Sequence, residues 1–496
     1  MFSFTSQLVS VKNNQISIFN ALMYGFSFSS RLPLRKLADR LRWRGERSRL
    51  ARLTIVSQYF PPDFAATGQF IEDLSRRLAE RGLQNLVLTG QPGYAFHANQ
   101  AERIEFLPNR CIRRTATSRF WPERIRGRVV NSLLFCLRTL LRLLRQCRRG
   151  DLLLFTTEPA YLPIVGWLCH LLTRAPYVVL VYDLYPDIAV SLGVIAADHP
   201  VARLWHLLQA SSFTAASEII VLSATMQEHL CQHYPSMRTP ITVIPSWADP
   251  ELIAPIPKQY NHFIHRHGLG DSFTVLYSGN QGRCHDLDTL LQSARLLRHE
   301  PQITVLIVGA GAQHRFLVEQ VEAWTLPNVR FLPYQDAADL PELLAAADLA
   351  IVSLLEAAEG QVAPSKLYGH LAAACPVAAI CAPRSYLRTE IARAGCGSAF
   401  ASGEAEALAN FIRSLVAAPG LAQQLGEAGR RHLLATATPA LVVQAYAELL
   451  ARHLPLGIKS YSKPIFADAD ALPIPQSISP MGLGVSSWKP GVERQW

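Results

Sequence analysis

Apolar residues in the first half of this chain occur in short continuous runs rather than in alternation with polar ones. Such runs predict strands at Leu53–Ser57, Asn85–Thr89, Leu152–Thr156, Val178–Tyr182, Ile219–Leu222 and Ile241–Ile244. The segments between them predict helices at Phe70–Arg81, Val129–Cys147 and Pro159–Leu172. Continuous apolar strands are typical of parallel sheets that are covered on both faces. Their alternation with helices predicts right-handed βαβ units.

This pattern stops at residues 245–250, where the sequence is Pro-Ser-Trp-Ala-Asp-Pro, and a polar stretch follows to Asp271. It then starts again, with predicted strands at Phe273–Ser278, Ile303–Val308, Val329–Phe331, Leu349–Val352 and Val377–Ile380. Helices are predicted at Leu287–Arg298, Gln313–Ala323, Asp339–Ala346, Lys366–Ala374 and Glu404–Val416. The fold class is therefore predicted to be α/β, with two Rossmann-like, doubly wound parallel sheets that face a cleft. Ligands of such sheets bind beyond the carboxyl ends of the strands.

The same pattern divides the chain into five parts. Residues 51–246 form the first Rossmann-like domain and residues 247–438 the second. We expect the helix in 439–454 to pack back on the body of the protein. Residues 1–50 are a basic extension, and residues 455–496, rich in Pro, Ser and Gly, are expected to be a flexible tail.

Composition narrows the classes of protein that this chain can belong to. Its 496 residues are 49% hydrophobic and 17% charged, which is enough apolar material for two or three cores and excludes a disordered chain. No apolar run reaches the roughly 18–20 residues of a spanning helix. Ile16–Phe28 has the apolar character of a secretory signal, but only Lys12 precedes it and no small-residue cleavage site follows. Nine scattered cysteines without a CxxC pair favour a reducing compartment.

Positive charge is concentrated in two blocks. The net charge is +10, yet residues 1–52 carry +8 and residues 103–149 carry +11, so the remainder is acidic. Within Val129–Arg149, four arginines follow one helical stripe and leucines occupy the rest of the surface: Arg138, Arg142, Arg145 and Arg149. Either the leucines are core and the arginines are solvated, or the helix docks on an anionic membrane. No nucleic-acid motif is present, so nucleic acid is not expected as a partner.

The second half opens with a turn suited to an anion. Gly279, Asn280 and Gly282 follow a predicted strand, and the two glycines permit close backbone approach. Arg283 offers a bidentate guanidinium to a diphosphate, and Asp286 is placed to cap the next helix. The alternative is an ordinary turn with a surface arginine.

A second loop in this half combines a carboxylate with a lysine. Glu359 and Gly360 are placed to meet sugar hydroxyls, whereas Ser365 and Lys366 begin the following helix, where an amine can reach a phosphate. Here too, both charges could simply be solvated. In the first half, Gly68 follows a strand end, in a position to let backbone amides approach a ligand. Asp183 follows another strand, as a base for an acceptor hydroxyl or as support for the proline turn beside it.

Six stretches of the chain together resemble glycosyltransferase family 4, and within it the colanic-acid and exopolysaccharide type. They are SQYFPPDFAATGQFIEDL, VYDLYPDIAVSLGVI, YSGNQGRCHDLDTLL, ITVLIVGAGAQ, NVRFLPYQ and VAPSKLYGHLAAACPV. They lie within about residues 53–380. The resemblance implies a GT-B fold, a nucleotide-sugar donor, retention of the anomeric configuration and no required metal or other cofactor.

By motif match, the resemblance also implies roles for particular residues. Arg283 and Lys366 would contact the donor diphosphate, and Glu359 with Gly360 would lie beside the donor sugar. The base would be met by the backbone of Leu332, Pro333 and Tyr334. Much of the family has two glutamates separated by seven residues, and alignment on the helix places Gln361 and Gly369 there instead. This departure puts the ribose contact in doubt.

Metal binding is not expected. Asp286-Leu-Asp288 and Asp468-Ala-Asp470 fit the DxD motif of metal-using GT-A enzymes, but the first opens a helix and the second lies in the tail. Gly309-Ala-Gly311 lacks the third glycine of a dinucleotide fingerprint and is interpreted as a strand-to-helix turn.

The sequence therefore predicts a retaining hexosyltransferase that transfers a sugar to a saccharide or lipid-linked acceptor in cell-surface polysaccharide biosynthesis. It would be cytoplasmic and peripheral at the inner face of the membrane. A nucleotide-sugar 2-epimerase of the same fold, and a catalytically degenerate membrane-associated assembly partner, remain open as alternatives. Catalytic roles are assigned to Glu359, Arg283, Lys366 and Asp183.

Overall fold

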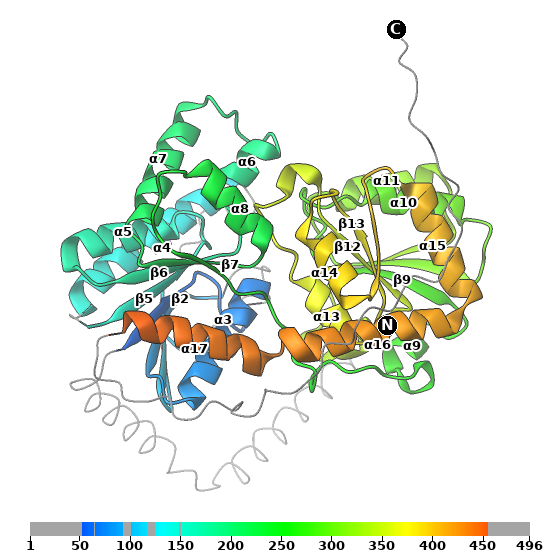
Figure 1. The fold of residues 1–496 in the computed structure, drawn as a ribbon, viewed down its shortest axis with the longest axis horizontal. Coiled ribbons are helices and arrows are strands. Elements are labelled where there is room, and N and C mark those ends of the chain that lie inside the picture. Colours follow the sequence, from blue (N-terminus) through cyan, green and yellow to red (C-terminus); the bar gives the residue numbers. More distant parts are fainter. Residues whose placement is uncertain (1–51, 64, 93–100, 117–124, 148–149, 455–496) are drawn as a thin grey trace, which may run out of the picture. The chain divides into compact units, whose positions relative to one another are not determined.

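The computed structural model describes residues 52–63, 65–92, 101–116, 125–147 and 150–454. The basic extension in 1–50, the apolar Ile16–Phe28, Arg149, Asp468-Ala-Asp470 and the tail in 455–496 lie outside these ranges. Two parallel sheets carry the fold (Figure 1). The predicted fold class, two Rossmann-like α/β domains of the GT-B kind, is confirmed. We call the two sheets with their helices the first and second lobes.

The first lobe is an eight-stranded sheet in the order β3-β4-β2-β1-β5-β6-β7-β8. Its strands are β1 Leu53–Val56, β2 Asn85–Gly90, β3 Ile104–Leu107, β4 Arg110–Thr115, β5 Leu152–Thr156, β6 Tyr177–Val181, β7 Glu218–Val221 and β8 Ile241–Val243. Its helices are α3 Ala66–Glu80, α4 Ile125–Gln146, α5 Leu162–Thr173, α6 Asp187–Ser191, α7 Pro200–Thr214 and α8 Ala224–His233. All pairings are parallel except β3 with β4. The central strands β1, β5 and β6 are buried at every position, as continuous apolar runs predict.

The second lobe is a six-stranded parallel sheet in the order β11-β10-β9-β12-β13-β14. Its strands are β9 Phe273–Ser278, β10 Ile303–Val308, β11 Val329–Leu332, β12 Leu349–Ser353, β13 Val377–Ile380 and β14 Gly397–Phe400. Its helices are α9 His262–His267, α10 Asp288–Leu296, α11 His314–Ala323, α12 Leu340–Ala345, α13 Lys366–Ala372, α14 Tyr386–Ala394 and α15 Ala405–Ala417, with 3-10 turns η1 Lys258–Tyr260, η2 Ala337–Asp339 and η3 Glu356–Ala358.

Alternate residues of each strand in the second lobe enter two separate cores. Leu276 and Leu306 face one core, whereas Val275, Tyr277 and Val305 face the other. This division follows from the two-residue period of a strand, which sends neighbouring side chains to opposite faces. Both faces of the sheet are therefore covered, and its free surfaces are the edges and the strand ends.

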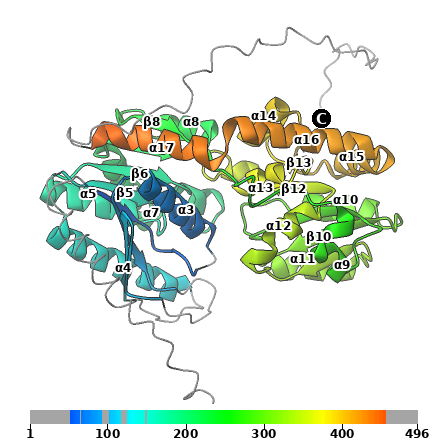
Figure 2. The ribbon, with the colours of Figure 1, turned by 90° about the horizontal axis from the view of Figure 1, so that it is seen from below.

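The chain crosses between the lobes near residue 247 and returns at the end. On the outward crossing, Trp247 Nε1 donates to Asp73 on α3 over 2.9 Å, and Asp249 pairs with Arg77 over 2.7 Å. After α16 Pro419–Thr436, helix α17 Pro439–His453 lies beside α3 in the first lobe (Figures 1 and 2). His453 Nε2 there donates to Glu218 Oε2 of β7 over 2.6 Å.

Residues Pro419–His453, which comprise α16 and α17, form the one helical stretch of the described chain that is long and apolar enough to cross a membrane. Half of its most apolar window is buried inside the protein. Buried core helices pass the same test of length and composition, so the stretch is weak evidence for a span.

The sequence left two alternatives open for helix α4, and the structure does not show the first of them, in which the leucines are core and the arginines are solvated. Several leucines face solvent instead: Leu133, Leu137, Leu141 and Leu144 are 36–52% exposed. Arg138 and Arg142 are only half-exposed, and burial lowers the pKa of Arg142, with a further contribution from Arg113. Phe135, Thr139 and Leu143 supply the buried face instead. A small part of the apolar content of α4 is sufficient to attach it to the sheet.

Candidate functional site

The turn after β9 packs backbone against backbone with the turn after β10. A Cβ atom on Gly309 would lie 2.2 Å from the carbonyl oxygen of Gly279, and one on Gly311 would lie 2.5 Å from Gln281. Gly279 and Gly309 also have φ values of +125° and +123°, which favour glycine. The predicted strand-to-helix turn at Gly309-Ala-Gly311 is confirmed, and the contact fixes the position of the anion-binding turn predicted from the sequence.

Two side chains of this turn are open to solvent. Asn280 and Arg283 are exposed, Gly282 is half-buried, and Arg283 forms no hydrogen bond to any residue that the structure describes. Asp286 is buried and caps α10, because its Oδ1 accepts from the Thr289 amide over 3.0 Å. That confirms its predicted capping role. Because Asp286 is engaged in this bond, it does not form a joint metal site with Asp288. The carboxylate of Asp288 accepts a hydrogen bond from Gln292.

Lys366 is the first residue of α13, the helix that follows β12, and its side chain reaches the turn after β9. Its Nζ atom lies 3.9 Å from the centroid of the Tyr277 ring, and a Cβ on Gly279 would lie 3.5 Å from it. The atom is buried and has no hydrogen-bond partner among the described residues. Burial lowers the pKa of Lys366 to about 7. A buried amine without an anion partner is a candidate for binding a negative group.

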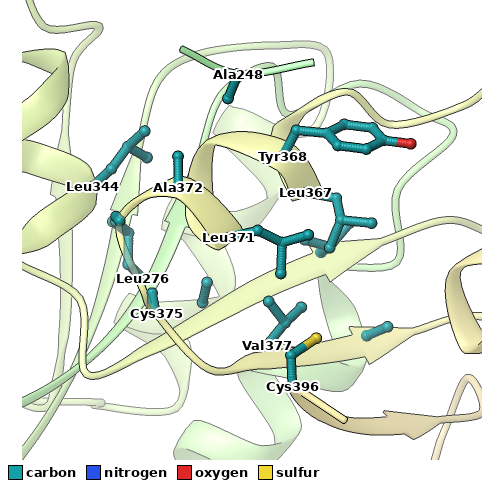
Figure 3. Close-up of a cluster of buried hydrophobic side chains, with 14 of the residues drawn as sticks. Ala248, Leu276, Leu344, Leu367, Tyr368, Leu371, Ala372, Cys375, Val377 and Cys396 are labelled. Carbon is teal, nitrogen blue, oxygen red and sulfur yellow. The ribbon is translucent and has the colours of Figure 1, made fainter. Parts of the chain in front are cut away.

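Helix α13 holds Lys366 in place through its buried face (Figure 3). Leu367, Leu371 and Ala372 are at most 2% exposed and lie in the same core as Leu276 and Val377 of the sheet. Ser365 precedes the helix, as predicted, although its side chain forms no capping bond. The charged Lys366 thus comes directly before a helical turn whose apolar side chains are buried in the core.

The loop between β12 and α13 contains a second unsatisfied charge. Glu359 is 8% exposed, and neither carboxylate oxygen has a hydrogen-bond partner in the described chain. Its neighbour Glu356 is exposed in η3, and Gln361 donates to Ser191 of the first lobe over 2.9 Å. Of the three polar residues considered for contact with a sugar, Glu359 alone combines burial with two unused oxygens.

Gly360 differs from the sequence expectation in what it approaches. It was expected to let the backbone near a sugar, but a Cβ there would lie 2.9 Å from the carbonyl oxygen of Thr225 and 3.0 Å from the Cβ of His229. Its φ is +75°. The glycine therefore brings the loop against helix α8 of the first lobe.

Asp183 lies at this junction between the lobes. It forms an isolated antiparallel bridge with Val362, and the next amide, Leu184 N–H, donates to the carbonyl of Gln361 over 2.9 Å. Burial raises the pKa of Asp183 to about 6. Burial, with a contribution from Asp183, also raises the pKa of Cys284 to about 11, while Lys366 acts on Cys284 in the opposite direction. Asp183, Cys284 and Lys366 are therefore electrostatic neighbours.

Glu158 is a candidate site residue that sequence reasoning missed. It follows β5, the neighbour of both β1 and β6, and Thr67 donates to its Oε2. Burial raises the pKa of Glu158 to about 7, opposed by the Thr67 bond and increased by Asp183 and Asp63. The sequence feature that could have revealed it is a carboxylate two residues after a buried strand, in Thr156-Thr157-Glu158.

The remaining predicted residues lie at the strand ends but without a contact to Lys366 in the described chain. Tyr334 is 57% exposed and its hydroxyl donates to the Ala310 carbonyl over 3.2 Å, beside Leu332 and the exposed Pro333. Gly68 lies in the first turn of α3, where a Cβ would be 3.0 Å from the Phe60 amide. Gly68 thus serves the packing of α3 on the loop after β1.

A hollow of about 510 Å³ lies elsewhere, among the residues that precede β9 and β12, including Lys258, Phe273 and Asp348. Ligands of such sheets bind at the opposite, carboxyl end of the strands. Lys258 there is already paired with Asp348 at 2.6 Å. We therefore take the carboxyl edges, and not this hollow, as the candidate site.

Two sheets joined in this order, parallel except for the β3–β4 pair, form the GT-B fold, and charged groups lie at their carboxyl edges. The model of Glycosyltransferase Family 4 matches residues 67–252, and that of Glycosyl transferases group 1 matches residues 261–432. The chain belongs to the GT-B glycosyltransferases that these two models describe, as the sequence resemblance predicts.

Individual proteins agree with this assignment. The chain is 24% identical over 369 residues to the probable glycosyltransferase WbjE of Pseudomonas aeruginosa, which covers 73% of this chain and 89% of that protein. It is 38% identical over 98 residues, 20% of this chain and 24% of the other, to WcaI of Escherichia coli (strain K12), named as a colanic acid biosynthesis glycosyl transferase. The structure of Anabaena Alr3699/HepE in complex with UDP-glucose is 16% identical, with a TM-score of 0.60 over 81% of this chain and 99% of that one.

Proposed function

We propose that this glycosyltransferase transfers a sugar from a nucleotide-sugar donor to a saccharide or lipid-linked acceptor, with retention, in the synthesis of a cell-surface polysaccharide. The observation that carries the proposal is the buried, unpartnered Nζ of Lys366 beside the Gly279 turn. A diphosphate supplies the negative charge that this amine lacks. The UDP-glucose complex of the Anabaena neighbour and the name of the Escherichia coli relative support the donor and the pathway class.

In this proposal the second lobe stabilises the leaving group. Lys366 and Arg283 donate charge-assisted hydrogen bonds to the diphosphate as negative charge develops on it. We propose that these two cations carry out this task without a required metal. Asp286 supports this view because it is engaged in capping α10. Gly279, Asn280 and Gly282 would approach the phosphates, and Leu332–Tyr334 the base.

The sugar and the acceptor meet carboxylates instead. Glu359 would accept hydroxyl groups of the donor sugar with its two unused oxygens. The pKa of Asp183 is raised, and the ionised form of this carboxylate would take the proton of the acceptor hydroxyl. Glu158 lies near Asp183 and would hold the acceptor side electrostatically.

Binding of nucleoside diphosphates is the direct test. Thermal shifts of the purified full chain with UDP, GDP, CDP, ADP and dTDP should identify one base, and Arg283→Ala should weaken that response. Arg298→Ala is the matched control, since Arg298 is an exposed arginine beyond the far end of α10. No response to any nucleotide, or equal loss in both variants, would contradict the proposal.

Two alternatives give different outcomes in a turnover assay. A 2-epimerase of this fold would convert the nucleotide sugar without an acceptor, and a degenerate assembly partner would neither transfer nor hydrolyse it. Product analysis of each nucleotide sugar, with and without a lipid-linked saccharide extract, separates the three. Transfer that depends on the extract supports the glycosyltransferase.

We also propose that the protein acts at the cytoplasmic face of an anionic membrane, through helix α4. The supporting observation is its exposed leucine stripe, with Leu137 the most exposed at 52%, next to the exposed Arg145. Apolar residues flanked by arginines are typical of helices in the lipid interface. This segment belongs to the basic block at 103–149.

Vesicle sedimentation tests this docking surface. Binding should require anionic lipid and fall as salt rises. Leu137→Ser with Leu141→Ser should weaken binding severalfold, whereas Leu296→Ser, at a 48% exposed leucine of α10, should not. Equal binding to neutral vesicles, or none to either, would contradict the proposal.

A further inference from the structure

Four side chains that bind metals in other proteins meet in the first lobe, away from Lys366. Asp187 begins α6, His206 lies in α7, and His229 and His233 lie one turn apart on α8. Because residues four apart share one face of a helix, both α8 imidazoles project the same way. His229 Nε2 is 3.4 Å from Asp187 Oδ1, and His233 Nδ1 is 3.5 Å from the same oxygen.

The spacing of these atoms matches a coordination sphere. Donor atoms of Asp187, His206 and His233 all lie within 4.8 Å of one another. Tetrahedral zinc, with bonds of about 2.0–2.1 Å to nitrogen and oxygen, holds its donors about 3.3–3.4 Å apart. The distances from Asp187 Oδ1 to His229 Nε2 and to His233 Nδ1 are close to this value, and the donor atom of His206 lies within 4.8 Å of those of Asp187 and His233.

Two polar atoms of this cluster have no hydrogen-bond partner among the residues that the structure describes. Asp187 is 6% exposed, and its Oδ2 has no hydrogen-bond partner in the described chain. His206 Nδ1 is likewise buried without one. Buried polar atoms left unpaired are costly, and a carboxylate most of all. In the part of the chain that the structure describes, only histidines form ion pairs with Asp187; no lysine or arginine does.

We propose that Asp187, His206 and His233 bind a divalent transition-metal ion of the zinc class, with His229 adjacent as the fourth donor. Imidazole with one carboxylate suits zinc, whereas magnesium and calcium prefer oxygen ligands. The ion would join three helices that are separate in sequence.

Such an ion would also fix the first lobe's side of the junction. Helix α6 follows directly after Asp183 and Leu184, which bond the second lobe at Val362 and Gln361. Helix α8 is the element that Gly360 approaches. The ion is thus a positioning element beside the candidate site, and its binding can be measured whether or not the proposed transfer reaction is correct.

The experiment is a metal titration of the tag-free full chain after chelator treatment and dialysis. We expect one zinc per chain by elemental analysis, and with Co²⁺ the visible absorption of a four-coordinate ion. His206→Ala and His233→Ala should each weaken Zn²⁺ binding at least about tenfold. The double variant His262→Ala with His265→Ala, at two exposed histidines of α9, is the control for adventitious surface binding and should retain the site.

Three outcomes would overturn the proposal. They are absence of both stoichiometric zinc and the cobalt spectrum in the unmodified chain, unchanged affinity in His206→Ala and His233→Ala, and loss of binding in the α9 control instead. Circular dichroism of each variant without metal checks that it is folded. If an alanine variant unfolds, His233→Gln replaces it, and the measurements on the unmodified chain still decide.

Discussion

The carboxyl edges of the two sheets carry opposite charge. In the first lobe, buried acids follow adjacent strands, with Glu158 after β5 and Asp183 after β6, and burial raises the pKa of both. In the second lobe, the edge carries Arg283 and Lys366, and burial lowers the pKa of the lysine. Each lobe therefore holds charges that the folded protein itself leaves uncompensated.

This difference matches two separate chemical tasks. Removing a proton from an acceptor hydroxyl requires a base, and neutralising a leaving diphosphate requires cations. The acids Glu158 and Asp183 form no ion pair with Lys366 in the described chain. Their separation on two sheets preserves both kinds of group for ligands, and the following changes would break or sharpen that contrast.

The largest effect is expected from the basic edge. Lys366→Ala should lower transfer about 100-fold and Arg283→Ala about tenfold, since charge-assisted hydrogen bonds contribute about 1.5–3 kcal/mol each. Neither change should lower the melting temperature, because Lys366 Nζ has no hydrogen bond to lose in the described chain and Arg283 is exposed. Steady-state kinetics measure the loss, and wild-type rates in both variants would reject the diphosphate clamp.

The pH dependence of nucleotide affinity sharpens the same prediction. With a pKa of about 7, Lys366 loses its proton in the free protein as pH rises through 7. Affinity for the nucleoside diphosphate should therefore fall above pH 7, and Lys366→Arg should remove that fall. Calorimetric titration between pH 6 and about 9 measures both; pH-independent affinity would show that Lys366 does not contact the phosphates.

The acidic edge of the first lobe should affect how the free energy of unfolding depends on pH. The pKa of Glu158 is raised from 4.5 to about 7, so its ionisation in the folded state costs free energy that is absent at about pH 4 and complete above pH 7. Glu158→Gln should therefore stabilise the protein at pH 8 by up to about 3 kcal/mol and leave it unchanged at pH 4. Denaturant unfolding measures the difference.

The exposed Glu356→Gln serves as control for that measurement and should have no effect at either pH. A Glu158→Gln protein that is destabilised at pH 8 would show that the carboxylate is satisfied in the folded state.

Glu359 is an acid on the second lobe, whose edge is otherwise basic. Its substitution tests whether this acid also takes part in the reaction. A contact that strengthens in the transition state affects kcat more than KM, so Glu359→Gln should lower kcat around tenfold and leave nucleotide affinity within a few-fold. Glu356→Gln should be mild. If Gln361→Ala is crippling while Glu359→Gln is not, the alignment anchored on the helix was right.

The last test concerns Asp183, where the expected effect is a change in the shape of the pH profile. If Asp183 is the base, kcat/KM should rise with pH through about 6, and Asp183→Asn should remove this limb of the profile. The backbone bridge to Val362 and the amide bond to Thr157 survive in the asparagine variant. An unchanged profile would assign Asp183 to the structural role that its sequence position left open.

The fold could be predicted wherever burial is two-sided. Strand β5 was predicted at its exact bounds because every residue from Leu152 to Thr156 is buried and apolar or small enough to enter the core. Strand β4 was missed because Arg110 and Arg114 are buried within it. Their ion pairs with Glu72 and Glu105 come from elsewhere in the chain, and a local pattern cannot show them.

Candidate site residues could be proposed from the sequence where one loop supplies the chemistry. Arg283 and Lys366 each stand next to glycine turns or a helix start, which local sequence reveals. Glu158, the outward face of α4 and the cluster around Asp187 were not found, because each depends on which distant elements pack together. For Gly360, the sequence predicted that a close approach requires glycine, but it did not predict that the approaching element is α8.

Helix α17 has a consequence for how this protein is made. Its residues Val443, Tyr446 and Leu450 are at most 1% exposed, and the Tyr446 ring lies 6.3 Å from that of Trp247. Because α17 leaves the ribosome after both sheets, the lobe that is synthesised first keeps an apolar surface uncovered until nearly the whole chain has emerged. Exposed apolar surface in a partly made chain is prone to aggregation. Completion of the first lobe thus waits for the second, and a chain that stops before Pro439 should yield a protein whose earlier half is the aggregation-prone one.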